Sequence, residues 1–453
     1  MPGLSPTTSL THIIHSVTLA VLLGSSAAWA APASIQLTLA DGTTGGAWFT
    51  PSMQQSTDVA YGVNRLATYG MESLYTSIDA PGLRQALLYT TATAWSFLIP
   101  STRWSHEEWH RAVLSYHGIS SRNALNNPAN WFATTASVDQ VLDADLAELK
   151  ASHPAAMVRL HAAGLEGQHA YVQRSTQAAF FSPQKGDGKG LFRTESGMSV
   201  PAYVTVFNDL VYHGLCADDG LDDMMEEINA LETTEASRDF TGPDCTSWVY
   251  DLYRPDEPYA DRGTHPTGTG VDRYRPRSVL TEDEKALLST TAVLALLDLV
   301  NPHLYTLDGF ELGTPGDRWL AGLGHGLTPW GYTIDGWALL QKGMLQAGAR
   351  VGMGVYGDGM APMISVDAYR LPFGGESWWW SAGLTGWLQP EGLRWDATAR
   401  EPGGALRLGA ARSLSNALDL QVSLTGKSTG WMEGIVALEP ALHGSAGLTM
   451  ALP

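Results

Sequence analysis

Two histidines flank a pair of glutamates in the segment WSHEEWHRAVLSYHG, residues 104–118. His106 and His110 are four residues apart, and the apolar residues around them recur at helical spacing. Side chains four apart lie on one face of an α-helix, one turn above each other, so the two imidazoles could bind one metal ion. Glu107 would then lie beside that ion, where a general base is needed. The chemistry indicated is hydrolysis by metal-activated water.

The five residues from His106 to His110 resemble the H-E-x-x-H motif of zinc metallopeptidases. The resemblance covers the motif and a second expected helix at 154–174. It implies that both histidines bind Zn²⁺, which makes water acidic enough to attack a peptide carbonyl near neutral pH. It also implies that Glu107 takes the proton of that water, and that the substrate is a peptide or protein.

A catalytic zinc ion has three protein ligands, so one more residue is required. His117 follows His110 at a spacing that does not match the metzincin pattern. In peptidases of the gluzincin type the third ligand is a glutamate on a later helix, and that order implies Glu166 in the segment RLHAAGLEGQHAYV. His161 and His169 in the same segment remain alternatives for the third ligand.

The start of the first helix is expected at Ser105. A serine followed three residues later by a glutamate is the capping-box spacing, which Ser105 and Glu108 satisfy. This assignment gives Glu108 to the backbone and leaves Glu107 free for chemistry. The alternative is an exposed helix on which the histidines have no function beyond titration.

The same residues permit a di-iron site. Glu107 with His110, and Glu166 with His169, each form a Glu-x-x-His pair. Di-iron carboxylate bundles use two such pairs together with two further glutamates from other helices. The further glutamates could be Glu72 and Glu148, which makes a di-iron oxidase a second enzymatic alternative.

The beginning of the sequence indicates export. Residues 17–30 are apolar and end in small residues, as in a secretory signal peptide cleaved before Ala31. Cys216 and Cys245 would then lie in an oxidising compartment and are plausible disulfide partners. We therefore expect the protein in the periplasm or the outer membrane.

The charge balance argues against nucleic acid as a partner. The chain has 27 basic and 46 acidic side chains and a formal net charge of -19. A surface with that balance repels a phosphate backbone.

Residues 31–345 are expected to form a mainly helical, zincin-like domain. Within it, the long segment 239–277 is rich in Trp, Tyr, Asp and Arg and is predicted to be an ordered loop that closes over the site. Tyr259, Arg262 or His265 could stabilise an oxyanion from that loop. The segment GLGHGLTPWG, residues 322–331, is interpreted as a connection.

Residues 346–453 are expected to form an antiparallel β domain, which makes the fold class α+β. In residues 418–425, Leu418, Leu420, Val422 and Leu424 alternate with polar residues, as in a half-buried strand. Seven or eight such runs would close into a β-barrel or a β-sandwich. The aromatic run SWWWSAGLTGW, residues 377–387, would suit a small outer-membrane barrel. A second hypothesis is therefore an outer-membrane structural or binding protein in which the HEEWH motif is inert.

Overall fold

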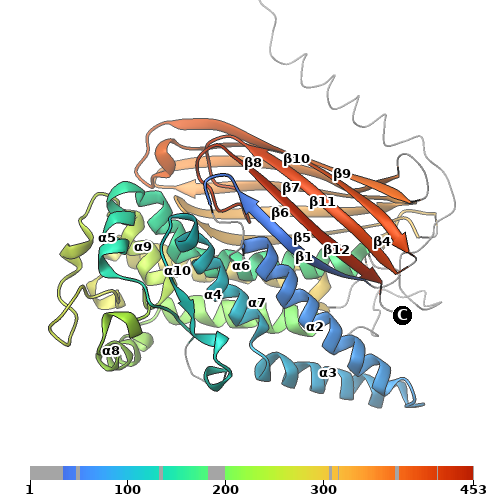
Figure 1. The fold of residues 1–453 in the computed structure, drawn as a ribbon, viewed down its shortest axis with the longest axis horizontal. Helices are drawn as coiled ribbons and strands as arrows, with labels where there is room; N and C mark the ends of the chain where they lie inside the picture. Colours follow the sequence, from blue (N-terminus) through green and yellow to red (C-terminus); the bar gives the residue numbers. More distant parts are fainter. Residues whose placement is uncertain are drawn as a thin grey trace, which may run out of the picture.

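A computed structural model describes residues 34–46, 52–131, 136–181, 199–305, 309–314, 316–372, 377–415 and 417–451. The expected signal peptide lies outside these residues. The fold is α+β, as predicted, with the helices in one layer and a large antiparallel sheet above them (Figure 1).

The helical layer contains nearly all of the chain between the first strand and residue 305. Its α-helices are α2 (Met53–Tyr75), α3 (Pro81–Leu98), α4 (Ser101–Tyr116), α5 (Asp143–Ser152), α6 (Pro154–Phe181), α7 (Ser199–Cys216), α8 (Asp222–Leu231), α9 (Asp244–Tyr253) and α10 (Glu282–Leu294). The α10 helix is followed directly by the 3-10 helix η7 (Ala295–Val300). Among the described helices, none is sufficiently long and apolar to cross a membrane.

The sheet has ten strands in the order β1-β12-β11-β10-β9-β8-β7-β6-β5-β4. The strands are β1 (Ser34–Thr43), β4 (Phe310–Glu311), β5 (Arg318–Thr328), β6 (Gly331–Lys342), β7 (Leu345–Tyr356), β8 (Gly359–Pro372), β9 (Trp378–Pro390), β10 (Arg400–Ser415), β11 (Leu418–Lys427) and β12 (Ala441–Ala451). From β4 to β12 each strand pairs with the next in sequence. A two-stranded ladder, β2 (Arg122–Asn123) with β3 (Val138–Asp139), lies among the helices.

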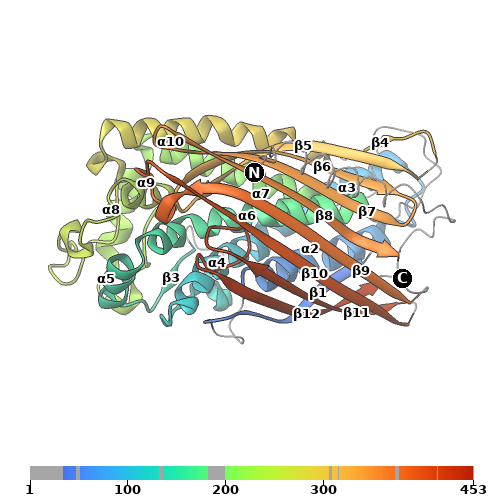
Figure 2. The same cartoon turned by 90° about the horizontal axis from the view of Figure 1, so that it is seen from above.

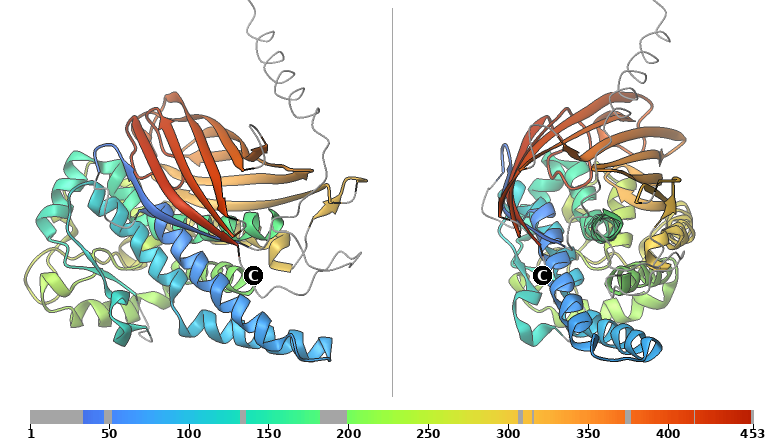
Figure 3. Two further views of the ribbon diagram at one scale, coloured as in Figure 1. Left: turned by 45° about the vertical axis from the view of Figure 1, so that its right-hand side comes forward. Right: turned by 90° about the vertical axis from the view of Figure 1, so that its right-hand side faces the viewer.

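The sheet is open, so the prediction of a closed barrel is wrong. Its edge strands are β1 and β4, which do not pair with each other. A sandwich is not formed either, because helices rather than a second sheet cover the concave face. Figures 2 and 3 show the sheet curving over the helical layer, with α6 running beneath it. Helices supply the apolar surface that a second sheet would otherwise bury.

The strands begin earlier in the sequence than expected. The sheet already includes Phe310, and residues 322–331, interpreted as a connection, form parts of β5 and β6. The segment 34–43, expected in the helical domain, is the edge strand β1 and pairs with β12. Four glycines in residues 322–331 conceal the period-two pattern, since a glycine on either face looks the same in sequence.

Two buried apolar clusters fix the helices that surround the candidate site. The first contains Trp109 and Leu114 of α4 together with Met157 and Leu160 of α6. The second joins α6, α9 and α10, and in it Trp248 is fully buried. The α10 helix begins with a capping box between Thr281 and Glu284. These contacts hold α4, α6 and α9 against one another.

Candidate metal centre

The two histidines of the HEEWH motif lie on one face of α4, as predicted from their spacing. The ring centroids of His106 and His110 are 4.9 Å apart. His110 Nδ1 lies 2.6 Å from the carbonyl oxygen of Leu160 on α6. A carbonyl can only accept, so Nδ1 carries the proton and Nε2 keeps its lone pair free. His110 is therefore fixed in the tautomer that a metal ligand needs.

Asp244 is the carboxylate that meets both imidazoles. Its Oδ2 lies 2.9 Å from Nε2 of His106 and 3.5 Å from Nε2 of His110. Among the described residues, His106, His110 and Asp244 form the one group whose ligand atoms lie within 4.8 Å of one another in a way that could hold a metal ion. Ligands that bind zinc tetrahedrally at about 2.0–2.1 Å are about 3.3 Å apart, close to both separations.

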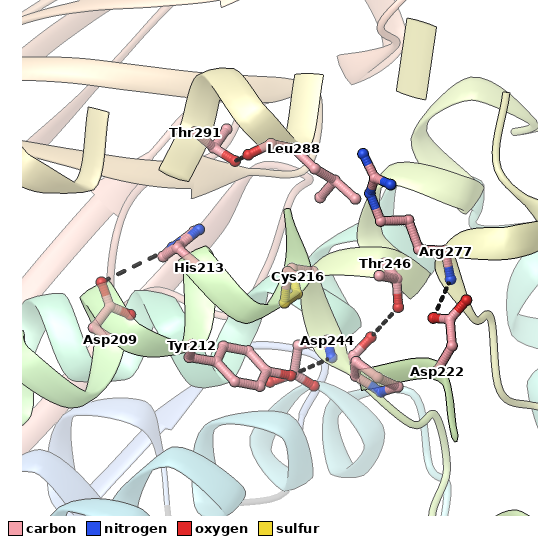
Figure 4. Close-up of a disulfide and its surroundings, with 12 residues drawn as sticks. Asp209, Tyr212, His213, Cys216, Asp222, Asp244, Thr246, Arg277, Leu288 and Thr291 are labelled. Atoms are coloured by element: carbon pink, nitrogen blue, oxygen red, sulfur yellow. Dashed lines mark hydrogen bonds and ion pairs between the residues drawn. A yellow bond between two sulfur atoms is a disulfide. The ribbon is translucent and has the colours of Figure 1, made fainter. Parts of the chain in front are cut away.

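Asp244 is held in place by two links to α7. It is the first residue of α9, and its backbone N–H donates to the Tyr212 hydroxyl at 2.7 Å. The next residue, Cys245, forms a disulfide with Cys216 at the end of α7, which confirms the predicted pairing. Figure 4 shows Tyr212, Asp244 and the disulfide side by side. The position of the carboxylate thus depends on both helices.

Gly164 of α6 lies directly against the two imidazoles. A Cβ atom at this position would be 2.3 Å from Nε2 of His106 and 2.4 Å from Nε2 of His110. These separations are far shorter than van der Waals contact. Only a glycine at this position therefore lets α6 pack against the two imidazoles where they stand.

The close approach of Asp244 to the two imidazoles shifts the pKa values of His106 and Asp244. Burial alone would lower the pKa of His106, but the hydrogen bond to Asp244 raises it to about 9. Burial alone would raise the pKa of Asp244, but His110 and His106 lower it below its ordinary value. The carboxylate is therefore ionised and could bind a cation in place of the proton on His106.

Glu107 lies beside this cluster and is buried. Burial raises the pKa of its carboxyl group, and the neighbouring His106 and His110 act in the opposite direction. Its carboxylate makes no hydrogen bond to any of the residues that the structure describes. An acidic group that is buried, close to the cluster and free of such a bond is suited to accept a proton.

The predicted start of the helix at Ser105 is wrong. The α4 helix begins at Ser101, and Ser105 is a buried residue inside it. Glu108 is indeed engaged, but with side chains rather than with a helix end: it accepts from Arg111 at 2.7 Å and from Asn123 at 2.8 Å. The first turn of α4 is formed by residues 101–104, so Ser105 does not lie at a helix end.

Glu166, the residue predicted as third ligand, lies elsewhere. Its carboxylate accepts from Arg159 at 2.8 Å and from the backbone N–H of Gly434 at 3.1 Å. His161 pairs with Asp251, with 2.8 Å between Nε2 and Oδ2. None of the predicted ligands on α6 is brought into the cluster. The third group that the structure places there is Asp244.

The residues of the di-iron alternative are not gathered into one site. Glu166 is paired with Arg159, and Nδ1 of His169 lies 2.8 Å from Glu433. Glu148 is on the exposed side of α5 and accepts from Ser152. The pair Glu166 and His169 therefore contacts other residues and does not meet the pair Glu107 and His110.

The three loop residues considered for oxyanion stabilisation have partners within their own region. Arg262 donates to Asp251 at 2.6 Å and is buried. Its guanidinium also lies over the Tyr259 ring. His265 Nδ1 lies 2.9 Å from the Thr267 hydroxyl. These contacts order the loop, as predicted, but direct none of the three toward His106.

A cavity of about 30 Å³ lies between α6, α7 and β5, and both apolar and polar side chains line it. Three imidazole nitrogens at this cavity lack a hydrogen-bond partner among the described residues: Nε2 of His169, Nδ1 of His213 and Nε2 of His325. Burial raises the pKa of Asp209, also at the cavity, to about 7. These unpartnered nitrogens could bind water in a cavity of this size.

Asp244 was missed at the sequence level. It begins a helix far along the chain from the histidines, in the segment GPDCTSW. The sequence feature that could have pointed to Asp244 is its neighbour Cys245, because a disulfide at Cys245 holds the adjacent backbone in place. Comparison with family models, with curated proteins and with solved structures finds no match to the chain.

Proposed function

We propose that the protein is a zinc-dependent hydrolase, most simply a metallopeptidase. In this proposal His106, His110 and Asp244 hold the ion and Glu107 is the general base. The observation that supports it is the convergence of two imidazole nitrogens and one carboxylate oxygen, whose atoms lie within 4.8 Å of one another. Two nitrogens and one oxygen suit zinc and leave one position for water or substrate.

Each residue of the cluster has a separate task in the proposed reaction. Bound zinc polarises a substrate carbonyl and makes water acidic. Glu107 accepts the proton of the attacking water and then delivers it to the leaving amine. The Leu160 carbonyl holds the His110 ring in its ligand tautomer, and Tyr212 holds the start of α9. A peptide substrate and a zincin-like fold are supported only by the resemblance of the motif.

The metal content of three variants tests the ligand set. We expect about one zinc per chain in the unmodified protein, and its loss in His110→Ala and in Asp244→Ala. Glu166→Gln should retain zinc, although it removes a charge from the Arg159 pair. Metal analysis of protein purified without chelator measures all three. If Glu166→Gln loses zinc and Asp244→Ala retains it, the third ligand is Glu166, as in peptidases of the gluzincin type. The absence of bound metal from every sample would contradict the proposal.

Export to an oxidising compartment is part of the proposal. It is supported by the disulfide, because such bonds persist in the periplasm and are rare in the cytosol. A second candidate function is a membrane-associated structural or binding protein with an inert HEEWH motif. The observation in its favour is the apolar outer face of the sheet described below.

A further inference from the structure

The outer face of the sheet is apolar and exposed. Cross-strand partners in the central strands share this face, for example Val366 with Leu384, Leu384 with Leu406, and Leu408 with Leu424. Leu384 is 63% exposed and Leu408 is 54% exposed. Further exposed residues on this face are Val351, Met353, Met360, Ile364, Leu388, Leu420, Val422 and Leu442.

The inner face of these and the neighbouring strands carries many polar groups, with buried aromatic side chains such as Trp337 and Trp387 among them. Arg350 of β7 donates to Asp335 of β6 at 2.6 Å, and Arg407 of β10 donates to Asp367 of β8 at 2.5 Å. Hydroxyl pairs such as Ser423 with Ser445 continue this pattern across β11 and β12. An antiparallel sheet in water places its apolar face on the core and its polar face outward. Here the arrangement is reversed.

Charges on the outer face lie toward the strand ends. In the described part of β6 to β12, the charged outward side chains are Lys342 at the end of β6, Arg400 at the start of β10 and Arg412 near its end. Exposed tryptophans occur at the same end of the sheet as Arg412, and Trp378 is its cross-strand partner. Between the ends, the outward positions are aliphatic, aromatic, Pro or Gly.

We propose that this face contacts the hydrocarbon core of a lipid bilayer. Polar residues inside, apolar residues outside and aromatic residues toward the rim are the pattern of strands that face lipid. The strands β5 to β12 have 10 to 16 residues, and about 9–11 residues suffice to span the core. The inference does not depend on the metal centre.

The edges of the sheet are compatible with this environment. Unpaired backbone groups at a sheet edge are costly in hydrocarbon. The α2 helix packs along β1. At the other side, β4 pairs only with the first two residues of β5, and η7 packs along the rest of β5, where Asp298 accepts the backbone N–H of His325 at 3.0 Å. The α2 and η7 helices therefore cover part of the two edges, and they lie beyond the outermost strands of the sheet (Figure 3).

A second copy of the chain is a less suitable occupant of this face. The sheet is convex on its outer side, as the end-on view in Figure 3 shows. Two identical convex faces touch along a narrow strip and leave most of the apolar surface in water. Fluid lipid can follow the curvature. The net charge of -19 disfavours anionic headgroups, so zwitterionic lipid is the appropriate probe.

Flotation with phosphatidylcholine vesicles tests the proposal. The unmodified protein should float with the vesicles. The double variant Leu384→Arg with Leu408→Arg should float at least about 30-fold less, because an arginine at mid-bilayer depth costs about 2–4 kcal/mol on a lipid-facing strand. Leu231→Arg is the matched control, since Leu231 of α8 is 79% exposed but lies away from the sheet. It should float as the unmodified protein does.

A spin-label measurement covers the case in which the arginine variants fail to fold. The chain has two cysteines, both in the disulfide, so an added cysteine gives a single labelling site. Nitroxides at Leu384→Cys and Leu408→Cys in vesicles should be reached by oxygen and not by a water-soluble nickel chelate. A label at Glu226→Cys on α8 should show the reverse. The proposal is overturned if the chelate reaches all three equally, or if the labels reveal contact between copies in lipid-free solution.

Discussion

Gly164 allows α6 to pack directly against the two imidazoles of α4. Any other residue would place a Cβ atom 2.3 Å from Nε2 of His106 and 2.4 Å from Nε2 of His110. The sequence gives no hint of this role, because a glycine inside a helix usually only lowers helix stability. The role follows from the packing of α6 against α4.

Gly164→Ala should therefore weaken zinc binding. Alanine favours the helix by about 1 kcal/mol over glycine, but its methyl group would push the two imidazoles out of their positions. We expect affinity for zinc to fall by at least about tenfold, the minimum typical of disturbed metal surroundings. Titration with zinc measures this. Gly214→Ala on α7 is the matched control, because a Cβ there meets nothing within 4 Å.

Glu107→Gln should separate metal binding from chemistry. Glutamine has the same shape but cannot accept the proton, so hydrolysis should fall by about 100-fold or more. Zinc content should not change, since Glu107 is not among the three grouped ligands. Activity against a peptide library, measured beside metal content, checks both. Glu282→Gln, an exposed residue of α10, is the control, and equal activity in the two variants would exclude Glu107 as the base.

The motif residues could be predicted from sequence, and their partner could not. His106, Glu107 and His110 are related by helical spacing, which is a local property. Asp244 joins them only after α9 packs against α4 and α6. Glu166 has the residue type and order of a third ligand, but Arg159, two turns earlier on the same face of α6, takes its carboxylate instead.

At the scale of elements, the disulfide is a link between α7 and α9 that helps to position Asp244, the proposed third ligand. It joins the last residue of α7 to the second residue of α9 across a sequence separation of 29. The pairing of the two cysteines was predictable from composition and expected export. Its effect on Asp244 was not, because it requires knowledge of where α9 begins.

Replacing both cysteines, Cys216→Ser with Cys245→Ser, should lower stability and metal affinity together. A closed loop of this length is worth about 3–4 kcal/mol in the chain-entropy model. Chemical denaturation measures the stability change, and zinc titration of the folded variant measures the affinity. If stability falls while zinc affinity stays the same, Tyr212 alone is sufficient to position Asp244.

At the scale of the whole molecule, ion pairs connect the helices to the sheet. Glu433, in the segment between β11 and β12, contacts His169 of α6 and Arg350 of β7. The fold class was predictable because period-two alternation is clear in strands such as β11. The outward direction of the apolar face of the sheet could not be predicted. Alternation shows that one face is apolar without showing whether that face is turned inward or outward.

The His169 pair predicts a pH dependence of stability. Burial alone would lower the pKa of His169, but Glu433 raises it to about 8. Its ordinary value is 6.5, so the added stability is fully present below about pH 6.5 and is lost as the pH rises through 8. The amount is about 2 kcal/mol. Between pH 6 and pH 9, the free energy of unfolding should therefore fall by about 2 kcal/mol more in the unmodified protein than in His169→Gln. Equal differences in both proteins would refute the assignment.

The pairing of β1 with β12 has a consequence for the order of folding. Residues such as Thr43 and His443 form a contact across a sequence separation of 400. During synthesis, β1 leaves the ribosome long before its partner, while the helices that carry His106, His110 and Asp244 can already pack. The sheet reaches its full width only after the last strand is made. Contacts this distant in sequence form slowly, so until then β1 has an unpaired edge that must be kept from pairing with other chains.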